Sequence, residues 1–237
     1  MIIKVSNQLK AKMSIAESDD YVDRYWITKL VNYITDWRYR KLVRIKDWLK
    51  EQMSSLKLQD IIKNNNLIDY VESDKYGNKL FDGLVRKILH LVYSRTVYQT
   101  DKTQYGVEEV WQTSIDTWNK KIGDCEDFSI LILTLARLCG VPPNRIRLVA
   151  GDVEGGGHAW IRYLPDFYPI NPVYIDGTYW VDLTPIPKRK FYNDTSDVIT
   201  EETIDNQKPK DSKYKRIWWG VNDEREYGEF RFIPTKA

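Results

Sequence analysis

Residues 122–142 have the sequence IGDCEDFSILILTLARLCGVP, and this stretch decides the fold. Its long apolar run ends at Gly140, and Val-Pro-Pro follows, a combination that commonly ends a helix. We therefore expect a helix from about Asp124 to Leu138, with Cys125 in its first turn. Because a helix N-terminus lowers the pKa of a thiol, Cys125 is the candidate nucleophile of the chain.

Three acids flank this cysteine: Asp124, Glu126 and Asp127. Carboxylates in the first turn of a helix accept hydrogen bonds from free backbone N–H groups and suit the helix dipole, so capping is the first explanation for them. A calcium site at Asp124 and Glu126 is the alternative, because calcium prefers clustered oxygen ligands. A bound cation would also offset the effect of acids beside a thiolate.

The sequence after this helix changes to a period of two, which predicts strands. RIRLVAGDV and HAWIRYL are two such stretches, and VYIDGTYWVDL predicts a hairpin that turns at Asp176-Gly177. Upstream, apolar residues at steps of three and four predict helices over residues 18–52 and about 80–93. Helices first and antiparallel strands afterwards indicate the α+β class.

Cys125, His158 and Asp182 are the side chains that predict catalysis. An imidazole beside a thiol can hold it as a thiolate and later protonate the leaving amine. A carboxylate on the strand after the histidine can hold the second ring nitrogen and fix the tautomer. Asp176 is a rival for Asp182, but its turn position explains it without a catalytic role.

The segments GDCEDFSILILTLARLCGVP, GGHAWIRY and YWVDLTP together resemble the transglutaminase-like superfamily, which has a papain-like fold. Residues 98–128, YQTDKTQYGVEEVWQTSIDTWNKKIGDCEDF, more particularly resemble the bacterial transglutaminase-like cysteine proteinases. The resemblance covers about residues 80–185. It implies a triad in which Cys125 is the nucleophile, His158 the general acid and base, and Asp182 the group that orients the histidine.

Two further roles rest on the same resemblance. The oxyanion of an acyl-transfer reaction needs donors, and the backbone N–H of Cys125 is one natural candidate. Trp111 and Gln112, in the matching upstream stretch, are candidates for the second donor. Some proteinases in the resembling branch bind calcium at the motif that here contains Asp124 and Glu126, and the reaction itself requires no other cofactor.

We expect a helical N-terminal region over residues 1–75 and a transglutaminase-like cysteine-hydrolase domain over residues 76–237. Residues 186–216 are polar and lack periodicity, which indicates a charged surface excursion of that domain. The predicted activity is cleavage or transfer of peptide or isopeptide acyl groups through a thioester on Cys125. The alternative is a structural or partner-binding protein, for example in a phage or secretion assembly, that uses the same scaffold.

The composition limits the partners of the chain. Its 36 basic and 34 acidic residues give a net charge of +2, which does not favour nucleic-acid binding. No apolar stretch is long enough to span a membrane, and the N-terminus lacks the apolar core of a signal peptide, so we expect a cytoplasmic protein, with virion association or export left open. The expected partners are a protein or peptide substrate and a protein bound by the aromatic N-terminal helices.

Overall fold

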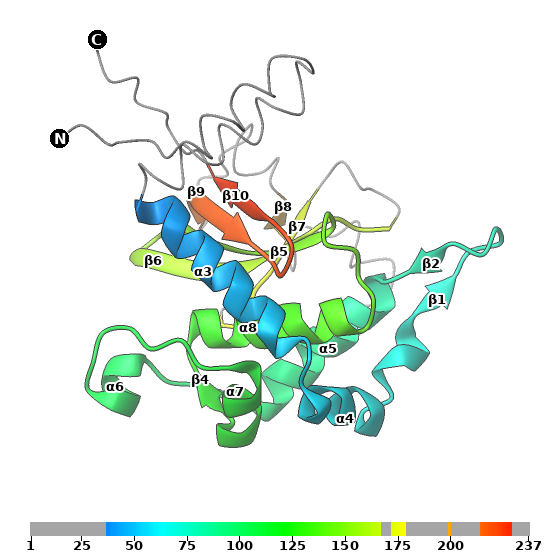
Figure 1. Cartoon of the computed structure of the whole chain (residues 1–237), viewed down its shortest axis with the longest axis horizontal. Helices are drawn as coiled ribbons and strands as arrows, with labels where there is room; N and C mark the ends of the chain where they lie inside the picture. Colours follow the sequence, from blue (N-terminus) through cyan, green and yellow to red (C-terminus); the bar gives the residue numbers. More distant parts are fainter. Residues whose placement is uncertain (1–36, 167–171, 179–198, 201–213, 229–237) are drawn as a thin grey trace, which may run out of the picture. The chain divides into compact units, whose positions relative to one another are not determined.

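The computed structural model describes residues 37–166, 172–178, 199–200 and 214–228 (Figure 1). Residues Ile45–Gly228 form one compact unit, and this unit contains the candidate site. A second unit comprises Met1–Arg44 and Glu229–Ala237, of which the structure describes only residues 37–44. The domain boundary predicted after residue 75 stays a prediction.

The described helices follow the apolar periodicity of the sequence. They are α3 (Trp37–Gln52), α4 (Leu56–Asn64), the 3-10 helix η1 (Leu67–Tyr70), α5 (Asp82–Arg95), α6 (Asp101–Tyr105), α7 (Ser114–Lys120) and α8 (Cys125–Leu138). The predicted helix at Cys125 is confirmed, and Gly140 after it has a φ of 95°, which favours glycine. The helix predicted over residues 18–52 is described only from Trp37 onward.

The main sheet supports the α+β class predicted from sequence. Its strand order is β10-β9-β5-β6-β7-β8, and every neighbouring pair is antiparallel. The strands are β5 (Ile146–Val153), β6 (Gly156–Tyr163), β7 (Val173–Ile175), β8 (Ile199–Thr200), β9 (Tyr214–Val221) and β10 (Glu226–Gly228). Two small pairs stand apart from this sheet: antiparallel β1 (Glu72–Ser73) with β2 (Lys79–Leu80), and parallel β3 (Val97–Tyr98) with β4 (Ile122–Gly123).

Helix α8 is the centre of the compact unit. It packs against β5 and β6 and also against α5 and α7, and every residue from Glu126 to Ala136 is buried (Figure 1). A helix enclosed on several sides has to be apolar around most of its circumference, which explains the mainly apolar run after Asp127. Burial of this run stabilises the position of the first turn, where Cys125 lies.

Small residues let the first turns of α8 approach the sheet closely. The Ser129 hydroxyl lies 2.8 Å from the backbone oxygen of Cys125 and 3.3 Å from that of Ala159 on β6. A Cβ atom at Gly177 would lie 3.2 Å from Phe128 Cβ, so a larger residue there would crowd the helix. The start of α8 is therefore fixed against β6 and the end of β7.

Part of the predicted hairpin lies outside the described residues. Strand β7 and the turn after it are described as far as Thr178, whereas Asp182 and nearly all of residues 186–216 are not. Within the described ranges, the helices are too short or too polar to cross a membrane.

Candidate active site

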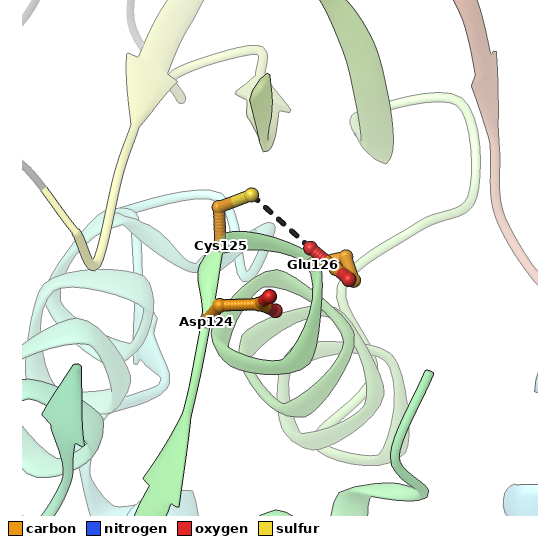
Figure 2. A group of neighbouring side chains, drawn as sticks. All are labelled: Asp124, Cys125 and Glu126. Carbon is orange, nitrogen blue, oxygen red and sulfur yellow. Dashed lines mark hydrogen bonds between the residues drawn. The ribbon is translucent and has the colours of Figure 1, made fainter. Parts of the chain in front are cut away.

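Cys125 is the first residue of α8, and its sulfur touches both its own helix and the neighbouring strand. The Sγ–H group donates to Glu126 Oε2 at 3.1 Å, as Figure 2 shows. The backbone N–H of Ala159 on β6 is near enough to the sulfur to lower the pKa of the thiol. The sulfur therefore lies against the peptide group that joins His158 to Ala159.

The surroundings of Cys125 favour the neutral thiol. Burial raises the pKa of Cys125 above its ordinary value, and the charge and hydrogen bond of Glu126 raise it further, while the N–H of Ala159 acts in the opposite direction. Burial is the largest of these effects. Burial thus acts against the lowered pKa expected from the helix start, and the acid neighbours act in the direction that the sequence indicates.

His158 is buried on β6, and one of its ring nitrogens contacts a carboxylate. Its Nε2 lies 2.6 Å from Oδ2 of Asp176, which also accepts a hydrogen bond from the hydroxyl of Tyr214 at 2.5 Å. The imidazole stacks on Trp160, with 5.9 Å between ring centroids. These contacts hold the imidazole in one orientation.

Asp176 occupies the predicted turn and contacts the histidine as well. Its Oδ1 accepts the backbone N–H of Thr178 at 2.8 Å, the local bond expected of an aspartate in a turn. The turn explanation from sequence holds, but it leaves out the second carboxylate oxygen, which reaches His158. Since Asp182 lies outside the described residues, its place in the triad stays a prediction.

The two candidate oxyanion donors are engaged with carboxylates. Gln112 Nε2 donates to Asp127 Oδ2 at 2.5 Å and to the backbone oxygen of Ile122 at 3.1 Å. Trp111 Nε1 donates to Glu109 Oε1 at 2.6 Å. In this arrangement both groups support the loop before α8, and their role as oxyanion donors stays a prediction.

The acids around Cys125 have two different environments. Asp127 accepts hydrogen bonds from the backbone N–H of Gln112 at 2.8 Å and from that of Asp124 at 3.4 Å, so it caps the helix as expected. Asp124 is the N-cap residue, but its buried Oδ1 has no hydrogen-bond partner in the described part of the chain. Asp124 and Asp127 form a capping box at the start of α8, which leaves the Oδ1 atom of Asp124 unexplained by capping.

A fourth acid, Asp101, joins this cluster from α6. Carboxylate oxygens of Asp101, Asp124 and Asp127 lie within 4.8 Å of one another, and so do ligand atoms of Asp124, Cys125 and Glu126. The parallel pairing of β3 with β4 brings the start of α6 beside the start of α8. Asp101 was missed from sequence, because only this pairing brings it to Asp124.

Burial makes the charged forms of these acids unfavourable. It raises the pKa of Asp124 to about 8 and that of Asp127 to about 6, and it also raises the pKa values of Asp101 and Glu126. The Oδ1 atoms of Asp101 and Asp124 are both buried without a partner among the described residues. Several buried carboxylates with unused oxygens are the donor set that a hard divalent cation prefers, so these residues fit calcium.

Residues 74–185 match a family model described as the transglutaminase-like superfamily. The chain contains a transglutaminase-like domain. The matched range includes Cys125 and His158, and it also extends over Asp182. The matched range begins before α5 and includes the contact between α8 and β6 at Ser129 and Ala159.

Three solved structures are similar to the chain at low sequence identity. Calcium-bound LapG of Legionella pneumophila is 16% identical with a TM-score of 0.48, over 73% of this chain and 86% of that one. EGTA-treated LapG of the same organism is 16% identical with a TM-score of 0.47, over 77% and 84%. A structure described as a TGase is 15% identical with a TM-score of 0.38, over 90% and 48%. No curated protein matches the sequence.

Proposed function

We propose that the chain is a cysteine hydrolase of the transglutaminase-like type, which cleaves or transfers peptide or isopeptide acyl groups. Membership of the superfamily supports a function of the cysteine-protease type. The observation that carries the proposal is the position of the Cys125 sulfur, at a helix start and against the backbone of His158, whose ring contacts a carboxylate. Nucleophilic acyl transfer further requires a ring nitrogen of His158 within hydrogen-bond reach of the sulfur when substrate is bound.

In the proposed reaction, the sulfur of Cys125 attacks the substrate carbonyl carbon while the thiol proton passes to His158. The backbone N–H of Cys125 donates to the oxygen that becomes negatively charged. His158 returns the proton to the leaving amine as the carbon–nitrogen bond breaks, which leaves a thioester on Cys125. Water then attacks the thioester to complete hydrolysis, or a second amine attacks it to complete transfer.

The carboxylate that orients His158 has two candidates. Asp182 matches the resemblance, and Asp176 makes the described contact with Nε2. Replacement of the orienting residue by asparagine should lower the acylation rate by several orders of magnitude, because the wrong tautomer of His158 is then favoured. Comparing Asp176→Asn with Asp182→Asn under identical conditions therefore assigns the role.

We also propose that calcium binds at Asp101, Asp124, Glu126 and Asp127. The unpartnered buried oxygens of Asp101 and Asp124 support this, as does the chemistry of the donor set. When bound, the ion supplies positive charge that offsets the carboxylates next to Cys125. The protein's part is to hold these oxygens together from two segments, the start of α6 and the start of α8.

The enzyme proposal is tested with p-nitrophenyl acetate, a small activated ester that needs no side-chain recognition. The wild-type protein should release a burst of nitrophenol and acquire an acetyl group on Cys125, located by mass spectrometry. Cys125→Ala should show neither, whereas Cys139→Ala, which removes the buried thiol at the far end of α8, should keep both. Acetylation that is unchanged by Cys125→Ala, or lost equally in both variants, contradicts the proposal.

A further inference from the structure

Strand β9 contains a bulge level with His158. Ala150 of β5 opposes Trp219 and Gly151 opposes Ile217, so Trp218 is an extra residue on β9. Gly151 is itself paired with His158 on the other side of β5. A β-bulge redirects a side chain and interrupts the regular alternation of faces, so the side chain of Trp218 is not where a regular strand would place it.

The residue opposite the bulge must be glycine. A Cβ atom at Gly151 would lie 1.9 Å from the backbone oxygen of Arg216 and 2.9 Å from Trp160 Cη2. Any side chain at Gly151 would therefore force β5 and β9 apart. The bulge therefore depends on residues of both strands: the extra residue Trp218 on β9 and the glycine at position 151 on β5.

The bulge directs the indole of Trp218 across β5 onto β6. A Cβ atom at Gly157 would lie 3.0 Å from Trp218 Cη2 and 3.5 Å from its Cζ3, so the ring covers the position where a side chain would be. Trp218 Nε1 donates to Asp152 Oδ2 at 2.9 Å, which fixes the orientation of the ring.

The indole therefore lies close to the nucleophile. Gly157 and Ala159 point to the same face of β6, and they are separated by roughly 7 Å along the strand. The hydroxyl of Ser129 lies 2.8 Å from the backbone oxygen of Cys125 and 3.3 Å from that of Ala159, so Ala159 adjoins the first turn of α8. The ring of Trp218 consequently covers β6 two residues before Ala159, the residue that meets the first turn of α8.

The indole is also open to solvent. Trp218 is 45% exposed, although it is a large apolar side chain. Beyond it, Gly155 and Gly156 are exposed, and a Cβ atom on either would meet nothing within 4 Å. Because the N–H of the indole is already bonded to Asp152, the ring offers an incoming molecule apolar surface only.

We propose that Trp218 forms an apolar subsite that binds an aliphatic or aromatic side chain of the peptide substrate beside the bond to be cleaved. This inference rests on the proposed function. Binding of an apolar side chain against an exposed, fixed aromatic ring removes apolar surface of both from water, which favours binding. Aromatic side chains often contribute most of the binding free energy in this way. Selection of substrate residues at this position is thus assigned to Trp218, Gly157 and the bulge that joins them.

One test measures binding without catalysis. In Cys125→Ala, N-acetyl-phenylalaninamide should shift the NMR signal of the Trp218 indole N–H, which is identified by its loss in Trp218→Phe. N-acetyl-glycinamide at equal concentration should leave that signal in place. Equal shifts with both compounds, or with neither, overturn the subsite.

The second test measures selectivity with p-nitrophenyl esters of N-acetyl-phenylalanine and N-acetyl-glycine. The ratio of their kcat/KM values should exceed one in the wild type, fall about tenfold or more in Trp218→Ala, and be largely kept in Trp218→Phe. Tyr76→Ala, an exposed aromatic in the β1–β2 turn, should leave the ratio unchanged. A ratio that Trp218→Ala does not alter overturns the inference.

The two proposals fail differently. If the wild type gives no acetyl-enzyme but N-acetyl-phenylalaninamide still shifts the Trp218 signal selectively, the proposed hydrolase is wrong and the apolar subsite stands. If the acetyl-enzyme forms and the Trp218 signal does not discriminate, the hydrolase stands and Trp218 serves only to stiffen the β5–β6 hairpin.

Discussion

Helices α5 and α8 both begin in buried clusters of carboxylates, but the two clusters differ in how their charge is balanced. At α5, Asp166 accepts the backbone N–H groups of Phe81 and Asp82, both at 2.7 Å, and Asp82 accepts the hydroxyl of Tyr163 at 2.7 Å. Arg145 donates to Asp166 at 2.5 Å and supplies the positive charge. This cluster is complete without any added group.

The cluster at α8 lacks such a cation. Within the described ranges, no lysine or arginine forms a salt bridge with Asp101, Asp124, Glu126 or Asp127. Two of its buried oxygens have no partner there either. The comparison shows that several buried carboxylates can stabilise a helix start when an arginine of the same chain balances their charge. Without one, the buried carboxylates and their unused oxygens support the calcium site proposed above.

The largest effect is expected from Arg145→Met, which removes the cation of the α5 cluster while it keeps most of the side-chain volume. A broken buried ion pair typically costs about 3–5 kcal/mol, because the remaining charge is buried without compensation. Urea unfolding should show this loss. Arg225→Met, at an exposed arginine, should change the free energy of unfolding little. A loss below about 1 kcal/mol for Arg145→Met would mean that the arginine does not balance the cluster.

Calcium should have the next largest effect, and only through the α8 cluster. At a concentration of 100 times its Kd, calcium stabilises the protein by about 2.7 kcal/mol. For a domain of this size that raises the melting temperature by roughly 5–10 °C. EGTA should reverse the change, Asp101→Asn should abolish most of it, and Glu108→Gln, at the exposed pair with Lys102, should not. An unchanged melting temperature with calcium would remove the contrast between the clusters.

The pH dependence of stability should distinguish Asp82 from an ordinary surface acid. Burial raises the pKa of Asp82 to about 7, from 3.8 in the unfolded chain. A raised folded-state pKa gives stability that is complete below about pH 4 and is lost as the pH rises through about 7. Between pH 5 and pH 8, the wild type should thus lose on the order of 2 kcal/mol relative to Asp82→Asn. If the free energy of unfolding, measured in urea, changed with pH by the same amount in both proteins, the raised pKa of Asp82 would be contradicted.

The helix start at α7, which is partly exposed and has a side-chain cap, should give the smallest effect. Helix α7 begins after Thr113, whose hydroxyl accepts the backbone N–H of Asp116 at 3.2 Å. Thr113→Ala should cost about 1 kcal/mol, independent of calcium. Ser94→Ala, which removes an exposed hydroxyl bonded within α5, serves as the matched control in the same urea titration. A calcium-dependent loss at Thr113 would show that the capped start of α7 is coupled to the acid cluster.

The features that sequence predicts well are local. The apolar run, the acids before it and Gly140 after it suffice to place α8 and Cys125, because each signal acts within a few residues of the helix it defines. The strand of His158 follows from a period of two in the same way. These are also the segments through which the family resemblance is recognised.

The features missed from sequence depend on pairings between distant segments. Asp101 reaches Asp124 only because β3 pairs with β4, and Trp218 reaches Gly157 only because β9 bulges against β5. The pKa of Cys125 depends on how deeply the finished fold buries it, which a helix start alone does not reveal. The periodicity of a sequence does not indicate which distant segments come into contact in the folded chain.

The pairing of β3 with β4 closes residues 99–121 into a loop whose ends are pinned side by side. The backbone N–H of Gln99 donates to the oxygen of Gly123 at 2.9 Å. Val107 and Glu108, in the outer part of this loop, are exposed. A protease that cuts there severs one peptide bond but leaves both ends anchored, so the nicked protein should elute as a single species in native buffer. It should separate into two fragments only in denaturant.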